Sequence, residues 1–119
     1  MNDTRFSNMV ARLIEETARG RMSWRLGQAP RSIIDGTEDR IGLYFEGVFK
    51  ETKFSIYELR FKNFTDEDAF NWSSTVVLAI VDYDDRVLWT QSNYRELYEL
   101  YDDVRRKASG VDRLLDYFR

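Results

Sequence analysis

Hydrophobic positions near the two ends of the chain recur with helical spacing. From Phe6 to Arg19 they follow the i, i+3, i+4, i+7 pattern, and Gly20 stands where a glycine commonly ends a helix. From Asn93 to Phe118 two apolar rows each repeat every seven positions. The rows are Leu97, Val104, Val111 and Phe118, and Tyr94, Tyr101, Ala108 and Leu115. The pattern predicts an N-terminal helix over 6–19 and a long C-terminal helix with one apolar stripe.

The C-terminal stripe stays in phase across Ser109 and Gly110, which favours one helix with a kink at Gly110. Ser109 followed by Asp112 is also a capping pattern, so the alternative is a break at this point that folds the last turns back onto the same chain. A continuous helix over 93–118 is about 39 Å long at 1.5 Å per residue, whereas a typical strand spans about 20 Å. We therefore expect part of the stripe to extend past the sheet.

Two segments between the helices alternate between apolar and polar residues, as half-buried strands do. Segment 41–49 carries Ile41, Leu43, Phe45 and Phe49 on one side, and segment 57–62 carries Tyr57, Leu59 and Phe61. The short polar connection 50–53 predicts an antiparallel hairpin.

Later segments complete the predicted sheet. Segment 76–81 is apolar on both sides, which is typical of a strand covered on both faces. A turn at 83–85 leads to a short fourth strand over 87–89. Segments 21–37 and 63–73 are expected to be irregular, with Trp24 packed against the core.

The elements together predict one α+β domain over residues 1–119. It has an N-terminal helix, an antiparallel sheet of about four strands, and a long C-terminal helix, with both helices packed on one face.

Composition excludes several chemistries. The chain has no histidine, no cysteine and a net charge of −3. Histidine is the commonest general base and metal ligand, and cysteine supplies the thiol nucleophile. We therefore expect no transition metal and no cofactor. The longest apolar run, 76–81, is too short to cross a bilayer, so we expect no membrane association and a cytoplasmic location.

Two acidic groups are candidates for cation binding or acid–base chemistry. Asp66, Glu67 and Asp68 lie together in the 63–73 segment, and they underlie the alternative of a small metal-dependent hydrolase or nuclease. Asp82 and Asp84 have the spacing of the first calcium ligands of an EF-hand, but the later ligand positions do not match. A polar hairpin turn explains the second group better.

Arginines mark the first helix. Residues 1–31 contain six arginines and three acids, and Arg5, Arg12 and Arg19 are spaced to line one side of the helix. Such a row can contact phosphates, which gives the alternative of a nucleic-acid-contacting module. An ordinary solvated face is the simpler interpretation, and the acidic whole chain argues against nucleic acid.

Four aromatic residues flank the acidic loop. They are either core residues or an exposed stacking or partner surface, and core packing is the favoured interpretation because large aromatics mostly bury. They are Phe61, Phe64, Phe70 and Trp72.

The stretch from Thr17 to Trp24 (TARGRMSW), followed by strands and a final helix with Leu97 and Tyr98, resembles a loose group of small uncharacterised bacterial proteins often found near mobile elements. The resemblance covers the helix–strands–helix order of the whole chain. It implies an accessory, defence-related or immunity-like role, and no functional residue follows from it.

We therefore expect a non-catalytic protein-binding accessory or regulatory factor. Its partner surfaces are expected at the arginine row and at the end of the C-terminal stripe, where two copies can meet in a homodimer. The candidate binding residues are Arg5, Arg12, Arg19, Val111, Leu115 and Phe118.

Overall fold

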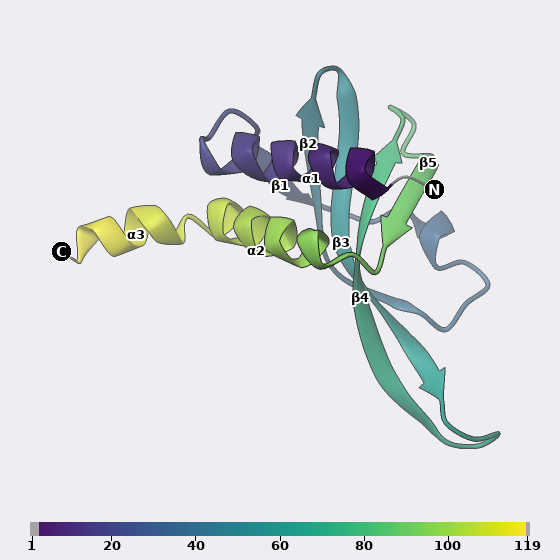
Figure 1. Ribbon diagram of the computed structural model, residues 1–119. Coiled ribbons are helices and arrows are strands. Elements are labelled where there is room, and N and C mark those ends of the chain that lie inside the picture. The colour runs from purple at the N-terminus through teal and green to yellow at the C-terminus, as the bar shows by residue number, and fades with distance from the viewer. Residues whose placement is uncertain (1–2, 119) are drawn as a thin grey trace.

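Five strands form one antiparallel sheet in the order β1-β2-β3-β4-β5, so that chain neighbours are also sheet neighbours (Figure 1). The computed structural model describes residues 3–118. It confirms the α+β fold and the N-terminal helix, with five strands in place of about four. The elements are α1 (Asp3–Ala18), β1 (Trp24–Gly27), the 3₁₀ helix η1 (Arg31–Ile33), β2 (Arg40–Phe49), β3 (Thr52–Phe64), β4 (Phe70–Val81), β5 (Val87–Ser92), α2 (Arg95–Ser109) and α3 (Val111–Tyr117).

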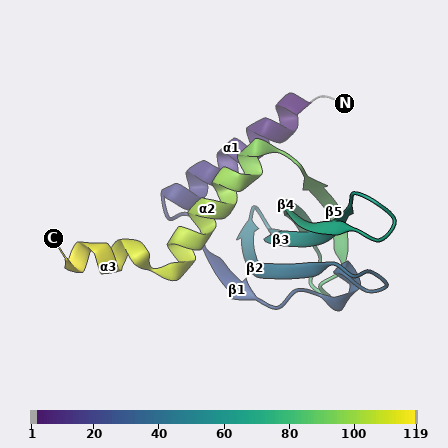
Figure 2. The same ribbon diagram turned by 90° about the horizontal axis from the view of Figure 1, so that it is seen from below.

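Helices α1 and α2 lie side by side over one face of the sheet (Figures 1 and 2). Ile56 of β3 and Leu78 of β4 are directly opposed in the register, and both are fully buried. Leu13 of α1 and Leu97 of α2 are fully buried in the same cluster. The periodic apolar faces of the two helices therefore meet the centre of the sheet, as the sequence predicts.

The opposite face of the sheet has a smaller core. Tyr44, Tyr57 and Val77 are buried there, and Ile33 of the 28–39 segment packs against them. The register of β2 shifts between Ile41 and Tyr44. This bulge reverses the alternation, because one extra residue exchanges the two faces of a strand. The expectation of a half-buried segment 41–49 is therefore wrong, because β2 has buried residues on both faces. Segment 57–62 of β3 keeps the expected alternation, since Tyr57 and Leu59 pack in the same cluster and Arg60 is exposed.

The segment after α1 is more regular than expected. Trp24 begins β1 and lies opposite Gly47 of β2, and its indole Nε1 donates a buried 2.9 Å hydrogen bond to Thr17 Oγ1. The buried Glu16 accepts hydrogen bonds from Arg21 Nε at 2.7 Å and from Arg12 Nε at 3.0 Å. The Thr17–Trp24 stretch thus joins α1 to the edge of the sheet, and the expected packing of Trp24 on the core is confirmed.

The predicted continuous C-terminal helix is wrong. Gly110 has a φ of +72°, which ends α2 and turns the chain into α3. Ser109 Oγ accepts a hydrogen bond from Val111 N at 3.2 Å. The alternative of a break at this point is the correct one, but α3 does not fold back. It extends away from the sheet (Figures 1 and 2).

Strands β3 and β4 continue well past their neighbours as a two-stranded arm, here defined as residues 61–74 (Figure 1). The connecting loop covers only 65–69, whereas the sequence predicted irregular structure over 63–73. Within residues 3–118, no helix is long and apolar enough to cross a membrane.

Candidate binding surfaces

The arm carries exposed aromatic side chains on one face. Phe64 opposes Phe70 and Lys62 opposes Trp72, so these four residues share a side of the hairpin. Phe64, Phe70 and Trp72 are 61%, 40% and 43% exposed. The favoured interpretation of this group as core residues is therefore wrong for these three. We call Arg40, Lys62, Phe64, Phe70 and Trp72 the arm surface.

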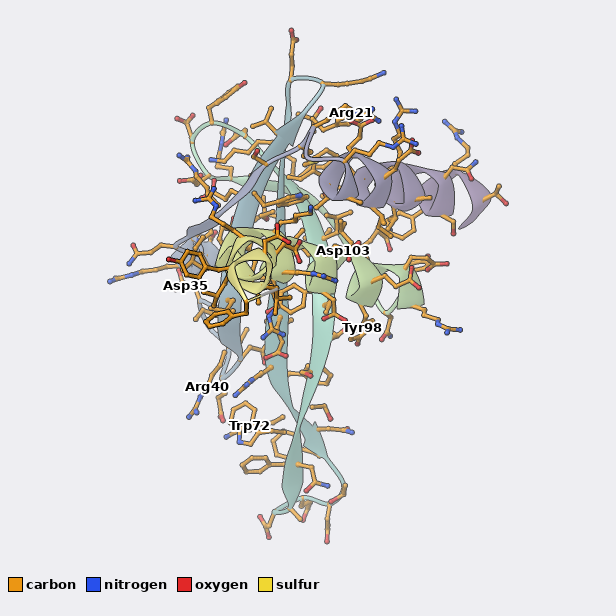
Figure 3. The ribbon with its side chains drawn as sticks, turned by 90° about the vertical axis from the view of Figure 1, so that its left-hand side faces the viewer. Arg21, Asp35, Arg40, Trp72, Tyr98 and Asp103 are labelled. Atoms are coloured by element: carbon orange, nitrogen blue, oxygen red, sulfur yellow. The ribbon has the colours of Figure 1, made fainter. Side chains whose placement is uncertain are left out.

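The side chains of the arm surface contact one another through ring–ring and cation–π interactions. The ring centroids of Phe64 and Phe70 are 5.7 Å apart, and those of Phe70 and Trp72 are 5.9 Å apart in an edge-on arrangement. The Arg40 guanidinium lies 4.8 Å from the Trp72 ring centroid, and Lys62 Nζ lies 4.5 Å from that of Phe70. Figure 3 shows Arg40 and Trp72 next to each other, far from Arg21 at the other end of the sheet. Such cation–π contacts restrain both partners.

The arm surface continues the face that the helices cover elsewhere. Residues of β3 alternate without a register shift from the buried Ile56 to Lys62. Glu58 lies between them on the same side. Burial, followed by the negative charge of Glu58, raises the pKa of Tyr101 on α2. Helix α2 does not extend over the sheet beyond Glu58, so the aromatic rings of Phe64, Phe70 and Trp72 are not covered by a helix. At the base of the arm lies a hollow of about 330 Å³, lined by Arg40, Glu58, Arg60, Trp72, Ser73 and Ser74.

The outer edge of β4 is open along the arm. Pairing between β4 and β5 begins at Val77 and Ser92. Among residues 3–118, no strand pairs with that side of residues 70–76. This seven-residue stretch (FNWSSTV) contains no charge and no proline. Natural edge strands are usually protected by charges, prolines or bulges, so the edge is available for strand addition.

Charges around the arm disfavour phosphate. The three cations Arg40, Arg60 and Lys62 are outnumbered by five carboxylates. Arg60 Nε pairs with Glu58 at 2.9 Å, and Lys62 pairs with Glu38. The five carboxylates are Glu38, Glu58, Asp66, Glu67 and Asp68.

The arginine row lies on the exposed side of α1, as its spacing predicts. Two of its members are engaged within the helix. Arg12 pairs with the buried Glu16, and Arg19 Nη2 lies 3.3 Å from Glu15. The hydrogen bond from Arg21 and the charges of Arg21 and Arg12 lower the pKa of Glu16 below its ordinary value. They outweigh burial, which by itself would raise that pKa. The row is therefore partly neutralised, and Arg12 has a structural role at the end of α1.

The other predicted binding residues lie on or next to α3. Leu115 and Phe118 are exposed, and Val111 is half-buried at the start of the helix. Val111 also lines one end of a groove of about 840 Å³ between α2 and the β1–β2 edge. The structure therefore brings Val111, Leu115 and Phe118 together at one end of the molecule, while Arg5, Arg12 and Arg19 lie on α1.

The acidic candidates do not converge on a site. Asp66, Glu67 and Asp68 are exposed at the tip of the arm, and residues 3–118 contain no group of three or more side chains able to hold a metal. Asp82 accepts backbone hydrogen bonds from Asp84 and Arg86, each at 2.9 Å. The first group is thus a solvated loop, and the second closes the β4–β5 turn, as the sequence predicts.

A hollow of about 580 Å³ lies on the face opposite the helices. It is bordered by the 28–39 segment and by β3, β4 and β5, and its lining includes Tyr57, Val77 and Arg86. Arg86 is already paired with Asp82 at 2.7 Å. Burial, followed by the charge of Tyr44, raises the pKa of Tyr57 to about 12. In the described part of the chain, the lining contains no carboxylate that could pair with this phenol in acid–base chemistry.

Sequence reasoning identified the aromatic group but assigned it to the core, and it missed Arg40 and the open edge. The uncharged stretch from Phe70 to Val76, in a chain with 33% charged residues, was the available signal. Strand pairing alone shows which side of it is uncovered. Comparisons of the chain with family models, curated proteins and solved structures find no match.

Proposed function

We propose that the protein is a non-catalytic protein-binding factor whose recognition surface is the β3–β4 arm. The observation that carries the proposal is the row of exposed aromatic rings beside an unpaired, uncharged strand edge. Trp and Arg are enriched among residues that dominate binding energy in protein interfaces, and Arg40 already stacks on Trp72. The proposal keeps the cytoplasmic setting expected from the composition.

The arm suits a partner that adds an extended segment to β4. Backbone groups along an open strand edge supply hydrogen bonds that do not depend on the partner's sequence. Side chains of the arm surface, above all Trp72 and Phe70, then select the residues of the partner strand. The exposed parts of Phe64, Phe70 and Trp72 amount to about 300 Å² if each ring offers roughly 150–250 Å².

A protein partner fits this surface better than nucleic acid. Stacking on aromatic rings is also used to bind single strands, but such sites line a positively charged groove. Here carboxylates outnumber cations around the arm, and two of the three cations are paired.

The proposal is tested by affinity capture with the tagged protein from a lysate of its source organism. The wild type is compared with a Trp72→Ala/Phe70→Ala variant and with Tyr83→Ala. Tyr83 is a matched control, because it is an exposed aromatic on the β4–β5 turn. We expect the wild type and Tyr83→Ala to retain the same partner and the arm variant to lose it. Calorimetry with the purified partner should then show binding to the first two proteins and none to the arm variant.

Equal capture by all three proteins would contradict the proposal. A parallel titration with a fluorescent poly-dT or poly-U oligonucleotide tests the nucleic-acid alternative. We expect no binding at physiological salt, and salt-sensitive binding lost on Arg40→Ala/Lys62→Ala substitution would support that alternative instead.

A further inference from the structure

Helix α3 is short and has little of the chain to pack against. It has seven residues and no buried residue. Leu114, Leu115, Tyr117 and Phe118 are 58%, 57%, 83% and 76% exposed. Isolated helices shorter than about 12 residues are marginal in water. A helix of this length with three exposed large apolar side chains, followed directly by the exposed Phe118, is therefore expected to be stabilised by contact with another surface.

A suitable surface lies at the same end of the molecule. The groove between α2 and the β1–β2 edge has a volume of about 840 Å³, within the range of about 300–1,000 Å³ that is usual for binding pockets. Its apolar lining includes Leu26, Leu43, Phe45 and Ala108, and Leu26 and Leu43 are exposed. Each copy of the chain therefore carries this apolar groove next to its apolar helix α3.

Charges on the two surfaces are complementary. The groove is rimmed by Arg25, Arg105 and Arg106 and by the single acid Asp102. Helix α3 contains two aspartates, Asp112 and Asp116, against the single Arg113. Arg106 pairs with Asp112 of its own chain at 2.7 Å, so Arg25 and Arg105 are the rim cations that can attract the helix of a mate.

The chain's own α3 is directed away from the groove. Gly110 adopts a left-handed conformation, and Arg106 Nε pairs with Asp112 Oδ1 at 2.7 Å across the junction. Ser109 Oγ donates to Arg106 O at 2.8 Å and accepts from Val111 N. These contacts fix the exit direction of α3 (Figure 2), so a second copy is the occupant that brings the same helix chemistry to the groove.

We infer that two copies exchange their α3 helices, each filling the groove between α2 and the β1–β2 edge of its mate. A two-fold axis near Gly110 makes both contacts at once, because helix and groove meet at Val111. The inference is independent of the arm and goes beyond the proposed function. It also assigns Val111, Leu115 and Phe118 to one interface.

Complete coverage of the exposed rings of α3 and its C-cap would bury enough area for a specific dimer. Tyr117 and Phe118 alone offer about 320 Å² per helix if each ring carries roughly 200 Å². With equal area on the groove and two symmetric contacts, the total is about 1,300 Å². Specific interfaces begin at about 1,200 Å² in total, so we expect a dimer of modest affinity.

Light scattering on the purified protein measures the assembly state. The chain has a mass of 14.2 kDa, and we expect a species of about twice that mass at tens of micromolar. Leu115→Glu on the helix and Leu43→Glu in the groove should each give a folded monomer with unchanged circular dichroism. Tyr83→Glu, at a comparably exposed site on another turn, should remain dimeric. A monomeric wild type, or a dimer that survives both interface variants, would overturn the inference.

Cysteine cross-linking tests the exchange directly, because the chain has no cysteine of its own. Leu26→Cys and Leu115→Cys proteins are prepared separately, mixed, and treated with a short bis-maleimide. We expect a covalent mixed dimer on a denaturing gel, with much less product from Tyr83→Cys mixed with Leu115→Cys. Both sites are exposed, so the substitutions leave the core intact. Equal yields from the two mixtures would refute the proposed contact.

Discussion

Substituting Gly47 with alanine should destabilise the protein through one steric conflict. Gly47 is buried under the Trp24 indole. A Cβ added there would lie 2.9 Å from Trp24 Cδ2, 3.0 Å from Trp24 Cε3 and 3.0 Å from Met22 Cε. Carbon atoms in contact prefer separations of about 3.5–4.0 Å, so the indole must move by about half an ångström or more.

The indole is not free to move without loss. Trp24 is only 7% exposed, and its Nε1 is held by Thr17 Oγ1 at 2.9 Å. Overpacking of this kind costs about 1–3 kcal/mol. The lower backbone freedom of alanine in the unfolded chain offsets about 0.4–1 kcal/mol. We expect a net loss of about 1–2 kcal/mol, which for a domain of this size lowers Tm by about 4–10 °C.

Urea unfolding followed by tryptophan fluorescence, with thermal melts by circular dichroism, measures the effect. Gly42→Ala is the matched control, because its Cβ would meet the flexible end of Glu58, Oε1, at 3.2 Å. That variant should stay within about 0.5 kcal/mol of the wild type. A Gly47→Ala variant as stable as Gly42→Ala would refute the assigned packing of Trp24 on Gly47.

A double-mutant cycle sharpens the test. Thr17→Val leaves the buried Trp24 N–H without its acceptor, which costs about 1–3 kcal/mol. If Gly47→Ala displaces the indole, part of that hydrogen bond is already lost, and the double variant should cost less than the sum of the single variants by about 0.5 kcal/mol or more. Strict additivity would show that the two substitutions do not act on the same ring.

Three further predictions rest on single residues. Leu97→Ala should lower the free energy of unfolding by about 2–5 kcal/mol in urea titrations, because Leu97 is fully buried between α2 and the sheet, and an unchanged midpoint would contradict its place in the core. The pKa of Glu16 is lowered, first by the Arg21 hydrogen bond, so its stabilising contribution is present above the unfolded value of 4.5 and is lost as the pH falls through the folded value. Glu16→Gln should therefore flatten the acid limb of a stability–pH curve, and a curve as steep as the wild type's would count against the ion pair. Burial raises the pKa of Tyr57 to about 12, so in an ultraviolet titration the Tyr57→Phe variant should differ from the wild type by one tyrosine that ionises near pH 12. If the missing tyrosine instead ionises near pH 10, the assigned burial of Tyr57 is wrong.

Local periodicity is sufficient for α1, for α2 and for the central strand, although it did not predict the break between α2 and α3. Leu97 and Val104 are buried as their spacing predicts, and segment 76–81 is covered on both faces. These features follow from the sequence because a residue's direction along a regular helix or strand depends only on its position. The helix end at Gly20 is also predictable from local sequence, because glycine readily adopts the left-handed φ of +73° that commonly ends a helix.

The bulge in β2 and the short strand β1 lie beyond such reasoning. The register shift between Ile41 and Tyr44 buries Tyr44 and exposes Leu43, although alternation predicts the reverse. Strand β1 has four residues and is defined by its pairing with β2, together with the Trp24–Thr17 hydrogen bond. Both depend on partners distant in the sequence, which local patterns do not contain.

The sequence by itself determined the α+β class, the central apolar segments and the absence of histidine and cysteine chemistry, because periodicity and composition are properties of the chain alone. Only the tertiary structure decided which apolar residues are covered. Leu97 and Leu115 lie in the same predicted stripe, yet Leu97 is buried and Leu115 is exposed, because the sheet ends beneath α2. Trp72 shares the aromatic character of Trp24, but no helix lies above it. Burial depends on which elements pack together, and these contacts between residues distant in the sequence determine where the candidate binding surfaces lie.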